Sequence, residues 1–180
     1  MRFPLLIALV LMLIGVTVVP AANGTKLDPG KPVLFAKRTK AGGCRLSPMP
    51  DRRCSPGAYA TKLTQAVVCA NGFHTGNYRG VPQSLKYAVE REYGMKAAKY
   101  GKALEIDHIV SLELGGSNDI ANLFPEKRDI APGYKLKDKL ENRLHGAVCV
   151  DHALTLRAAQ KAIAKNWETL YKKIYGVLPQ

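Results

Sequence analysis

An Asp-His pair in the middle of the chain has the residue types that phosphodiester hydrolysis needs. The pair, Asp107 and His108, ends an apolar run that begins at Leu104. Neighbouring residues of a strand point to opposite faces, so a carboxylate can hold a cation while the imidazole beside it faces a water or a phosphate. An unperturbed histidine is largely neutral at pH 7 and can accept a proton. The pair therefore predicts a cation ligand, Asp107, next to a general base, His108.

A turn and an asparagine follow the pair. Gly115 and Gly116 predict a tight turn, and Asn122 lies 14 residues after His108. An asparagine there can bridge backbone groups across the loop and hold the base in place. The carboxylate of Asp107 is a hard oxygen ligand, most suited to Mg²⁺ or Mn²⁺, with Zn²⁺ as a further choice.

The order Asp107-His108-Ile109-Val110, Gly115-Gly116 and Asn122-Leu123 resembles the HNH endonuclease (ββα-metal) motif. The resemblance implies that His108 activates water, that Asp107 binds a divalent metal ion and that Asn122 braces the loop. It also implies an α+β fold, in which a short two-stranded ribbon and a helix form the ββα-metal core. Additional helices and disulfides would surround this core. Further segments between Cys54 and Trp167 resemble small exported bacterial HNH nuclease-like proteins.

The third metal ligand is where the chain departs from the family, because residues 124–132 delay the helix that would carry it. Asn142 is the first candidate, Asp138 the second and His145 the third. Asp138 and Asn142 are four residues apart, so both can face one cation on a helix. Glu105 shares a strand face with Asp107, where it either supports the metal site or faces solvent.

The chain is strongly basic, with a formal net charge of +13. Such a charge favours a polyanionic partner, of which nucleic acid is the first candidate. The residues expected at phosphates are Arg79, Lys86, Arg143 and the lysines at 135, 137 and 139, although each is also an ordinary solvated charge. No helix-turn-helix or zinc finger is visible, so binding should be salt-sensitive and nearly independent of sequence.

The N-terminus predicts export. Arg2 precedes an apolar run over 5–19, shorter than the roughly 20 residues of a membrane-spanning helix. We expect a cleaved signal peptide over 1–24, with an uncleaved anchor as the alternative, and a secreted or periplasmic protein. Four cysteines fit two disulfides in that setting, and three pairings are possible. The favoured pairing is Cys44–Cys54 and Cys69–Cys149.

The rest of the chain reads as one domain. Residues 25–60 predict an extended Gly/Pro-rich basic leader with a local disulfide, and 61–180 predict a single domain with the motif at 104–145. Apolar spacing predicts four helices, over 61–71, 81–93, 133–149 and 155–175. Short strands are expected over 103–107 and 109–114.

Together these features predict a secreted, metal-dependent HNH endonuclease that cleaves DNA, and RNA as a further substrate, as a monomer without stable membrane insertion. Two alternatives remain open. One is a catalytically inactive scaffold that binds nucleic acid or another polyanion. The other is a nuclease toxin of the colicin kind, whose partner would be an acidic immunity or inhibitor protein.

Overall fold

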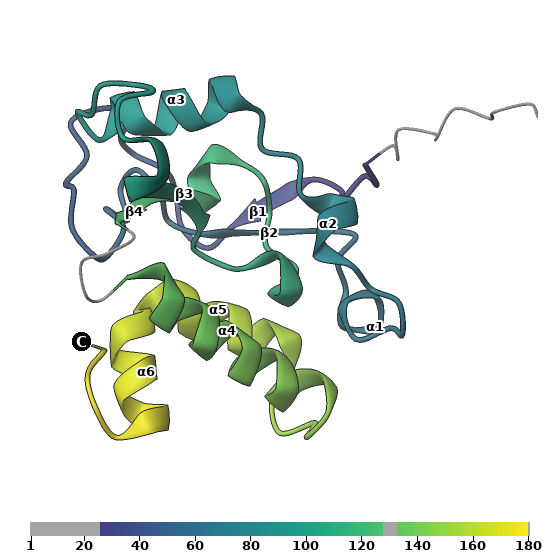
Figure 1. The fold of residues 1–180 in the computed structure, drawn as a ribbon. Helices are drawn as coiled ribbons and strands as arrows, with labels where there is room; N and C mark the ends of the chain where they lie inside the picture. Colours follow the sequence, from purple (N-terminus) through teal and green to yellow (C-terminus); the bar gives the residue numbers. More distant parts are fainter. Residues whose placement is uncertain (1–25, 128–132, 180) are drawn as a thin grey trace, which may run out of the picture.

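The computed structural model describes residues 26–127 and 133–179, so the expected signal peptide over 1–24 lies outside the described residues. The architecture is mixed α+β, with two small antiparallel sheets and a set of helices (Figure 1). The elements in chain order are β1 Pro32–Leu34, β2 Ala58–Ala60, α1 Gln65–Val68, α2 Thr75–Tyr78, α3 Gln83–Glu92, β3 Leu104–His108, β4 Leu123–Lys127, α4 Tyr134–Cys149, α5 Leu156–Lys165 and α6 Trp167–Tyr175.

The ribbon that carries the Asp-His pair is formed by β3 and β4, with Glu105 opposite Glu126 and His108 opposite Leu123. The sequence-based choice of 109–114 as the second strand was wrong. That segment leads into a 3₁₀ turn, which ends at Gly115 in the left-handed region at φ 71°. The true partner contains Pro125, which is tolerated because a two-stranded ribbon has free edges.

Helix α4 follows β4 and was predicted almost to the residue. Its apolar stripe buries Leu140, Leu144 and Val148, while Leu136 packs at the margin of the core. Helix α4 contacts α1, α5 and α6, as well as the 3₁₀ turn at Leu112–Leu114.

The last predicted helix, over 155–175, is two helices in the structure. Asn166 adopts an extended backbone at φ −170° and accepts a hydrogen bond from the N–H of Thr169 at 2.8 Å. An asparagine at an N-cap satisfies a free amide of the first turn, so the chain restarts as α6 after a bend. Trp167 at the bend is buried.

Both disulfides of the favoured pairing are present, Cys44–Cys54 and Cys69–Cys149. Two bonds of this kind fit a protein of an oxidising, extracellular or periplasmic compartment. The segment expected as an extended leader packs on the domain, because β1 pairs with β2 and both Cys44 and Cys54 belong to the common core.

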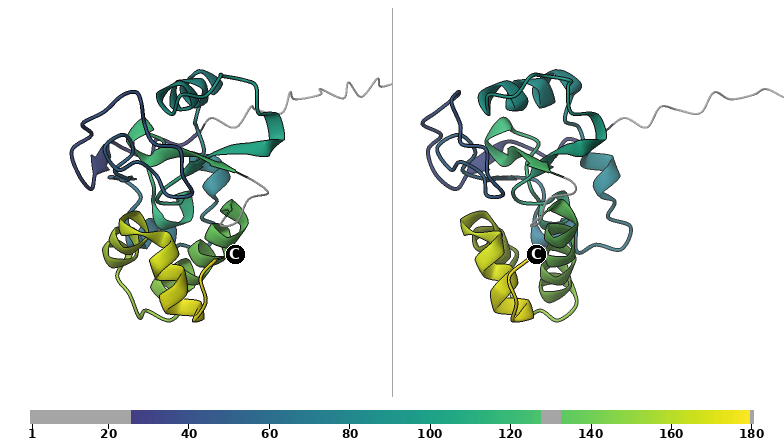
Figure 2. Two further views of the ribbon diagram at one scale, coloured as in Figure 1. Left: turned by 90° about the vertical axis from the view of Figure 1, so that its left-hand side faces the viewer. Right: turned by 60° about the vertical axis from the view of Figure 1, so that its left-hand side comes forward.

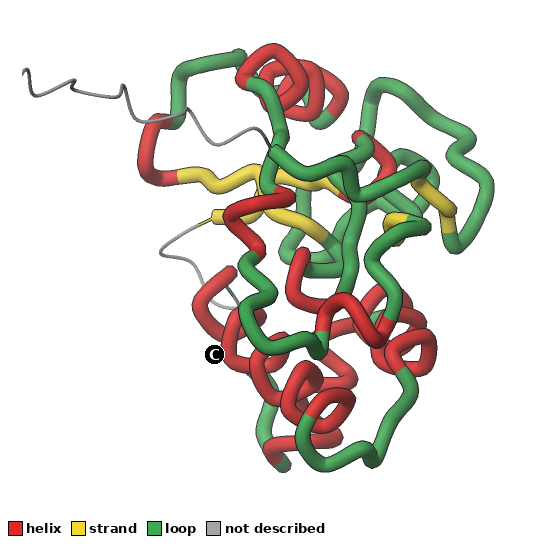
Figure 3. Tube along the Cα trace, turned by 90° about the vertical axis from the view of Figure 1, so that its right-hand side faces the viewer, coloured by secondary structure: helices red, strands yellow, loops and turns green. Residues whose placement is uncertain are grey.

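The elements form layers around the ribbon. Helix α3 covers one side of β3 and β4, and α4, α5 and α6 gather on the opposite side (Figures 1 and 2). Long loops connect these elements (Figure 3). Over the residues that the structure describes, no helix has the length and apolar character needed to cross a membrane.

Candidate active site around His108

Asn122 braces the loop between the two strands of the ribbon. Its side chain is completely buried, and its Oδ1 accepts hydrogen bonds from the N–H groups of Ala58 and Val110 at 3.1 and 3.0 Å. Its Nδ2 donates to the carbonyl oxygens of Val110 and Ser117 at 3.0 and 2.8 Å. These four bonds use two donors and two acceptors of the amide. Asn122 thus ties the loop to itself and to β2, in the bracing position expected from the sequence.

The glycine turn closes the same loop. A Cβ atom built on Gly116 would lie 1.7 Å from the carbonyl oxygen of Val110, so no other residue fits without moving the backbone. Gly115 has a positive φ, which residues with a side chain rarely adopt. The two glycines therefore fix how closely the loop folds back on β3.

His108 ends β3 and is only 4 % exposed. Its Nε2 lies 3.0 Å from Oδ1 of Asn118, whose Nδ2 donates to the carbonyl of Tyr78 at 2.7 Å. Because the Asn118 amide nitrogen is committed to Tyr78, its oxygen must accept, and Nε2 of His108 must donate. The proton is therefore on Nε2, which leaves Nδ1 able to accept a proton from water.

His108 is also neutral at physiological pH. Burial disfavours the charged imidazolium and lowers the pKa of His108 to about 4, although Asp107 and Asn118 oppose this shift. The ring is consequently an available proton acceptor throughout the neutral range.

Asp107 is held by a lysine from α4. Lys137 is completely buried, and its Nζ donates to Oδ2 of Asp107 at 2.7 Å, to the carbonyl of His108 at 2.6 Å and to Oε1 of Glu141. Burial would lower the pKa of Lys137, but the carboxylates around it outweigh burial and raise it. Burial would likewise raise the pKa of Asp107, but the charge and hydrogen bond of Lys137, together with His108 and Glu126, lower it overall. Asp107 and Lys137 therefore form a buried ion pair.

Two more buried carboxyl groups surround this pair. The pKa of Glu126 is raised to about 10, first by burial and then by the charge of Asp107. Neither oxygen of Glu126 meets a hydrogen-bond donor within the described parts of the chain. The pKa of Glu141 is raised to about 8 by burial. Both groups are mainly protonated at pH 7, and a protonated Glu126 can donate to the neighbouring Asp107.

A small pocket of about 90 Å³ opens next to His108. Glu105, which is half-buried, and Asp138, which is exposed, both line it, and burial followed by repulsion from Asp107 raises the pKa of each. Arg79, at the end of α2, supplies a positive charge to the lining. The full lining comprises Thr75, Arg79, Glu105, Asp107, His108, Ser111, Leu112, Glu113, Asp138 and Glu141.

Of the three expected metal ligands on α4, only Asp138 reaches this pocket. Asn142 is exposed, and its Nδ2 donates to the carbonyl of Asp138 at 3.0 Å. His145 instead contacts the carbonyl of Val68 at 3.2 Å and lies close to the sulfur of Cys149. Across 26–127 and 133–179, no group of three or more His, Cys, Asp or Glu side chains is placed to share a metal ion.

The residues expected at phosphates are scattered. Arg79 lines the His108 pocket, whereas Lys86 lines a larger pocket of about 490 Å³ under α3. Arg143 pairs with Asp151 at 2.8 Å on the surface. Lys135 and Lys139 are exposed, and Lys139 lies over the ring of Tyr175. The prediction that Lys137 contacts phosphate was wrong, because its ammonium is fully buried and held by carboxyl groups.

Asn118, Glu126 and Glu141 were not predicted as residues of the site, and Lys137 was predicted only as a phosphate contact. Lys137 and Glu141 have the same four-residue spacing as the predicted pair Asp138 and Asn142, but one position earlier on α4. Which of the two pairs faces the interior depends on how α4 packs against the rest of the fold, and this packing brings Lys137 to Asp107. The spacing alone fitted both pairs equally well.

The chain matches no protein-family model, no curated protein and no solved structure. The features of this chain that bear on its function are the fixed proton of His108, the loop held by Asn122 and the lysine at Asp107.

Proposed function

We propose that the protein is an exported endonuclease that hydrolyses phosphodiester bonds of DNA, with RNA as a second substrate class and little sequence specificity. In this proposal β3, β4 and α4 form an HNH-type (ββα) core. The chain order of strand, braced loop, strand and helix supports it. So does the net charge of +13, which favours a polyanionic substrate.

The observation that carries the proposal is the state of His108. Its proton is held on Nε2 by Asn118, so the free Nδ1 is the acceptor, and the ring borders a small pocket lined by Arg79. A general base needs this combination of a fixed ring, a neutral state and access to a water molecule.

The reaction follows from these positions. Nδ1 of His108 takes a proton from water as the water oxygen bonds to phosphorus and the bond from phosphorus to O3′ breaks. The O3′ oxygen leaves as a hydroxyl after protonation from solvent, which gives 5′-phosphate and 3′-hydroxyl ends. Arg79 would stabilise the negative charge that accumulates on the phosphate oxygens. Asp107 and Lys137 would hold the strand end that carries the base.

A divalent metal ion does not fit the residues around Asp107 as the structure places them. Mg²⁺ needs open oxygen ligands in near-octahedral arrangement. Here Oδ2 of Asp107 and Oε1 of Glu141 already accept from the Lys137 ammonium, and Asn142 and His145 line no part of the pocket. No step above depends on a metal, and the Mg²⁺, Mn²⁺ or Zn²⁺ cofactor predicted from the sequence stays a prediction.

A plasmid-nicking assay on the oxidised protein tests the proposal. His108→Ala should lower the nicking rate by at least about 100-fold, the usual contribution of a general base. His74→Ala is the matched control, because His74 is exposed and makes no capping hydrogen bond. Nicking by His108→Ala at the wild-type rate would exclude His108 as the base.

A second candidate function is a binding module that holds nucleic acid without cleaving it. The buried ion pair of Asp107 and Lys137 favours it, since a metal-dependent site would need that carboxylate. A salt-sensitive gel shift with no cleavage by the wild type would select this function. A tight complex with a small acidic protein would instead point to a toxin with its immunity protein.

A further inference from the structure

We propose that the Lys137 ammonium is the resident cation of this site and fills the position between β3 and α4 that a divalent metal would occupy. Folding around Asp107, and cleavage at His108, would then need no divalent metal. The statement about cleavage rests on the proposed function, whereas the statement about the cation does not. Lys137 is here a positioning residue, because it contacts the base only through the backbone.

The contacts of Lys137 resemble a coordination shell. Three oxygens surround Nζ: a carboxylate oxygen of Asp107, the carbonyl of His108 and a carboxyl oxygen of Glu141. An ammonium has three hydrogens to donate, so all of them are used. Lys137 and Glu141 reach this point from consecutive turns of α4. The arrangement joins helix to strand as a metal ion would.

A second cation at Oδ2 of Asp107 would compete with the Lys137 ammonium for the same oxygen. Lys137 has no exposed surface, so its side chain cannot swing into solvent without a local opening of the fold. A metal ion at Oδ2 of Asp107 would have to displace the ammonium and leave a buried charge without partners. Such a state is strongly unfavourable in a low-dielectric interior.

The lysine also sets the position of the base. Its hydrogen bond to the carbonyl of His108 holds the backbone of the residue that carries the imidazole. Asn118 holds the imidazole ring itself. The ring is thus fixed through backbone and side chain together. A covalently attached cation keeps this arrangement whether or not metal is present.

Substitution of the lysine by a metal ligand gives a direct test. Lys137→His would place an imidazole near Asp107 and one helical turn from Glu141, which together offer three ligands for Mn²⁺ or Zn²⁺. We expect the Tm of the wild type to be the same in EDTA, Mn²⁺ and Zn²⁺. The Tm of Lys137→His should rise by several degrees with Mn²⁺ or Zn²⁺ over EDTA. Lys139→His, exposed on the same helix, should show no such rise.

The wild-type measurements decide the proposal even if Lys137→His does not fold. Calorimetric binding of one Mg²⁺ or Mn²⁺ ion, or a Tm that falls in EDTA, would overturn the resident-cation role. Nicking by the wild type that stops in EDTA would overturn the metal-independent cleavage. If the wild type nicks under no condition, the proposed function fails, while the calorimetric and Tm data still decide the cation.

Discussion

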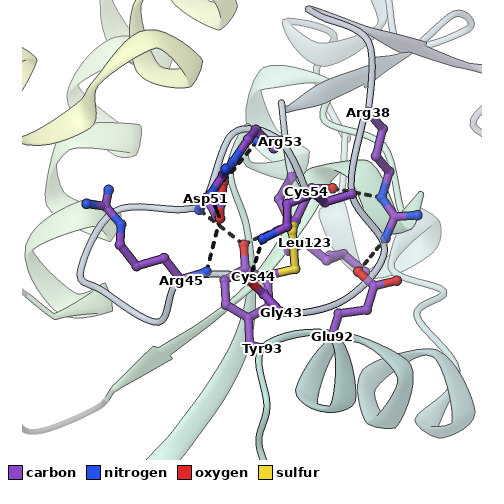
Figure 4. Close-up of a disulfide and its surroundings, with 12 residues drawn as sticks. Arg38, Gly43, Cys44, Arg45, Asp51, Arg53, Cys54, Glu92, Tyr93 and Leu123 are labelled. Carbon is purple, nitrogen blue, oxygen red and sulfur yellow. Dashed lines mark hydrogen bonds and ion pairs between the residues drawn. A yellow bond between two sulfur atoms is a disulfide. The ribbon is translucent and has the colours of Figure 1, made fainter.

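Two clusters of charged side chains in this protein differ in how many hydrogen-bond donors they offer to each carboxyl group. At the Cys44–Cys54 disulfide, both carboxylate oxygens of Asp51 are saturated with donors (Figure 4). Oδ2 accepts from the N–H of Arg45 and from Nη2 of Arg53, and Oδ1 accepts from the backbone and Nε of Arg53, all between 3.0 and 3.2 Å. The Arg53 side chain, followed by backbone N–H groups, holds the pKa of Asp51 far below its usual range.

The cluster around Lys137 instead has more carboxyl oxygens than hydrogen-bond donors to bind them. One ammonium serves the carboxyl groups of Asp107 and Glu141, and neither oxygen of Glu126 meets a donor in the part of the chain that is described. Burial raises the pKa values of Glu126 and Glu141. An arrangement with too few donors costs stability, and such arrangements occur preferentially at functional sites. The comparison indicates that the Asp51 cluster is structural, whereas the Lys137 cluster is the one that would serve the proposed chemistry at His108.

Removal of the cation from each cluster should give the largest difference between them. Lys137→Met leaves the largely buried carboxyl group of Asp107 without its cation, so the free energy of unfolding should fall by about 3–5 kcal/mol. Arg53→Met should lower it far less, because the Arg53 side chain is largely exposed and backbone N–H groups still bind Asp51. Urea unfolding of both variants measures the two values. Equal losses would mean that the two clusters do not differ in kind.

The pH dependence of stability should have opposite signs at the two clusters. Unfolded Glu126 ionises near 4.5, whereas folded Glu126 keeps its proton to about 10. Between these values the folded state binds more protons, so this group lowers the free energy of unfolding as pH rises. Glu126→Gln should therefore be more stable than the wild type at pH 8 by more than about 1 kcal/mol, and nearly equal to it at pH 4.5.

Asp51 provides the contrast in the same experiment. Its folded pKa lies below the ordinary 3.8, so its contribution is complete above that value and is lost as pH falls. Asp51→Asn should thus be less stable than the wild type at pH 8. A Glu126→Gln variant that is also less stable at pH 8 would contradict the protonated state of Glu126.

The smallest expected effect is on the acid side of the pH–rate profile. The base acts when deprotonated, so the rate should fall only as pH drops through about 4, the pKa of folded His108. At pH 5.5 kcat/KM should remain close to its plateau, whereas a histidine of ordinary pKa near 6.5 would have lost about tenfold. A profile that falls by half near pH 6.5 would show that burial does not depress the pKa of the base.

Local signals in the sequence were enough to predict part of this structure. Pro82 and the stripe from Leu136 to Val148 located α3 and α4, because capping and apolar periodicity are local properties. The disulfide pairing followed from chain order and a preference for one local and one long loop. The spacing from His108 to Asn122 located the loop and the residue that braces it.

The errors arose where tertiary contacts decide. Residues 109–114 have an apolar pattern suited to a strand, but the chain there is folded back by Gly115 and held by Asn122. A lysine such as Lys137 is ordinarily solvated, and only its position opposite Asp107 makes burial favourable. Asn166 ends one helix and starts the next, which a continuous apolar stripe conceals.

The Cys69–Cys149 bond closes a ring with a sequence separation of 80 residues. Every residue that lines the His108 pocket, from Thr75 to Glu141, belongs to that ring. A protease that cuts one peptide bond anywhere between the two cysteines would therefore leave a single covalent molecule. Its two fragments would separate on an electrophoresis gel only after reduction, so an exported protein of this design can retain the whole pocket after being nicked.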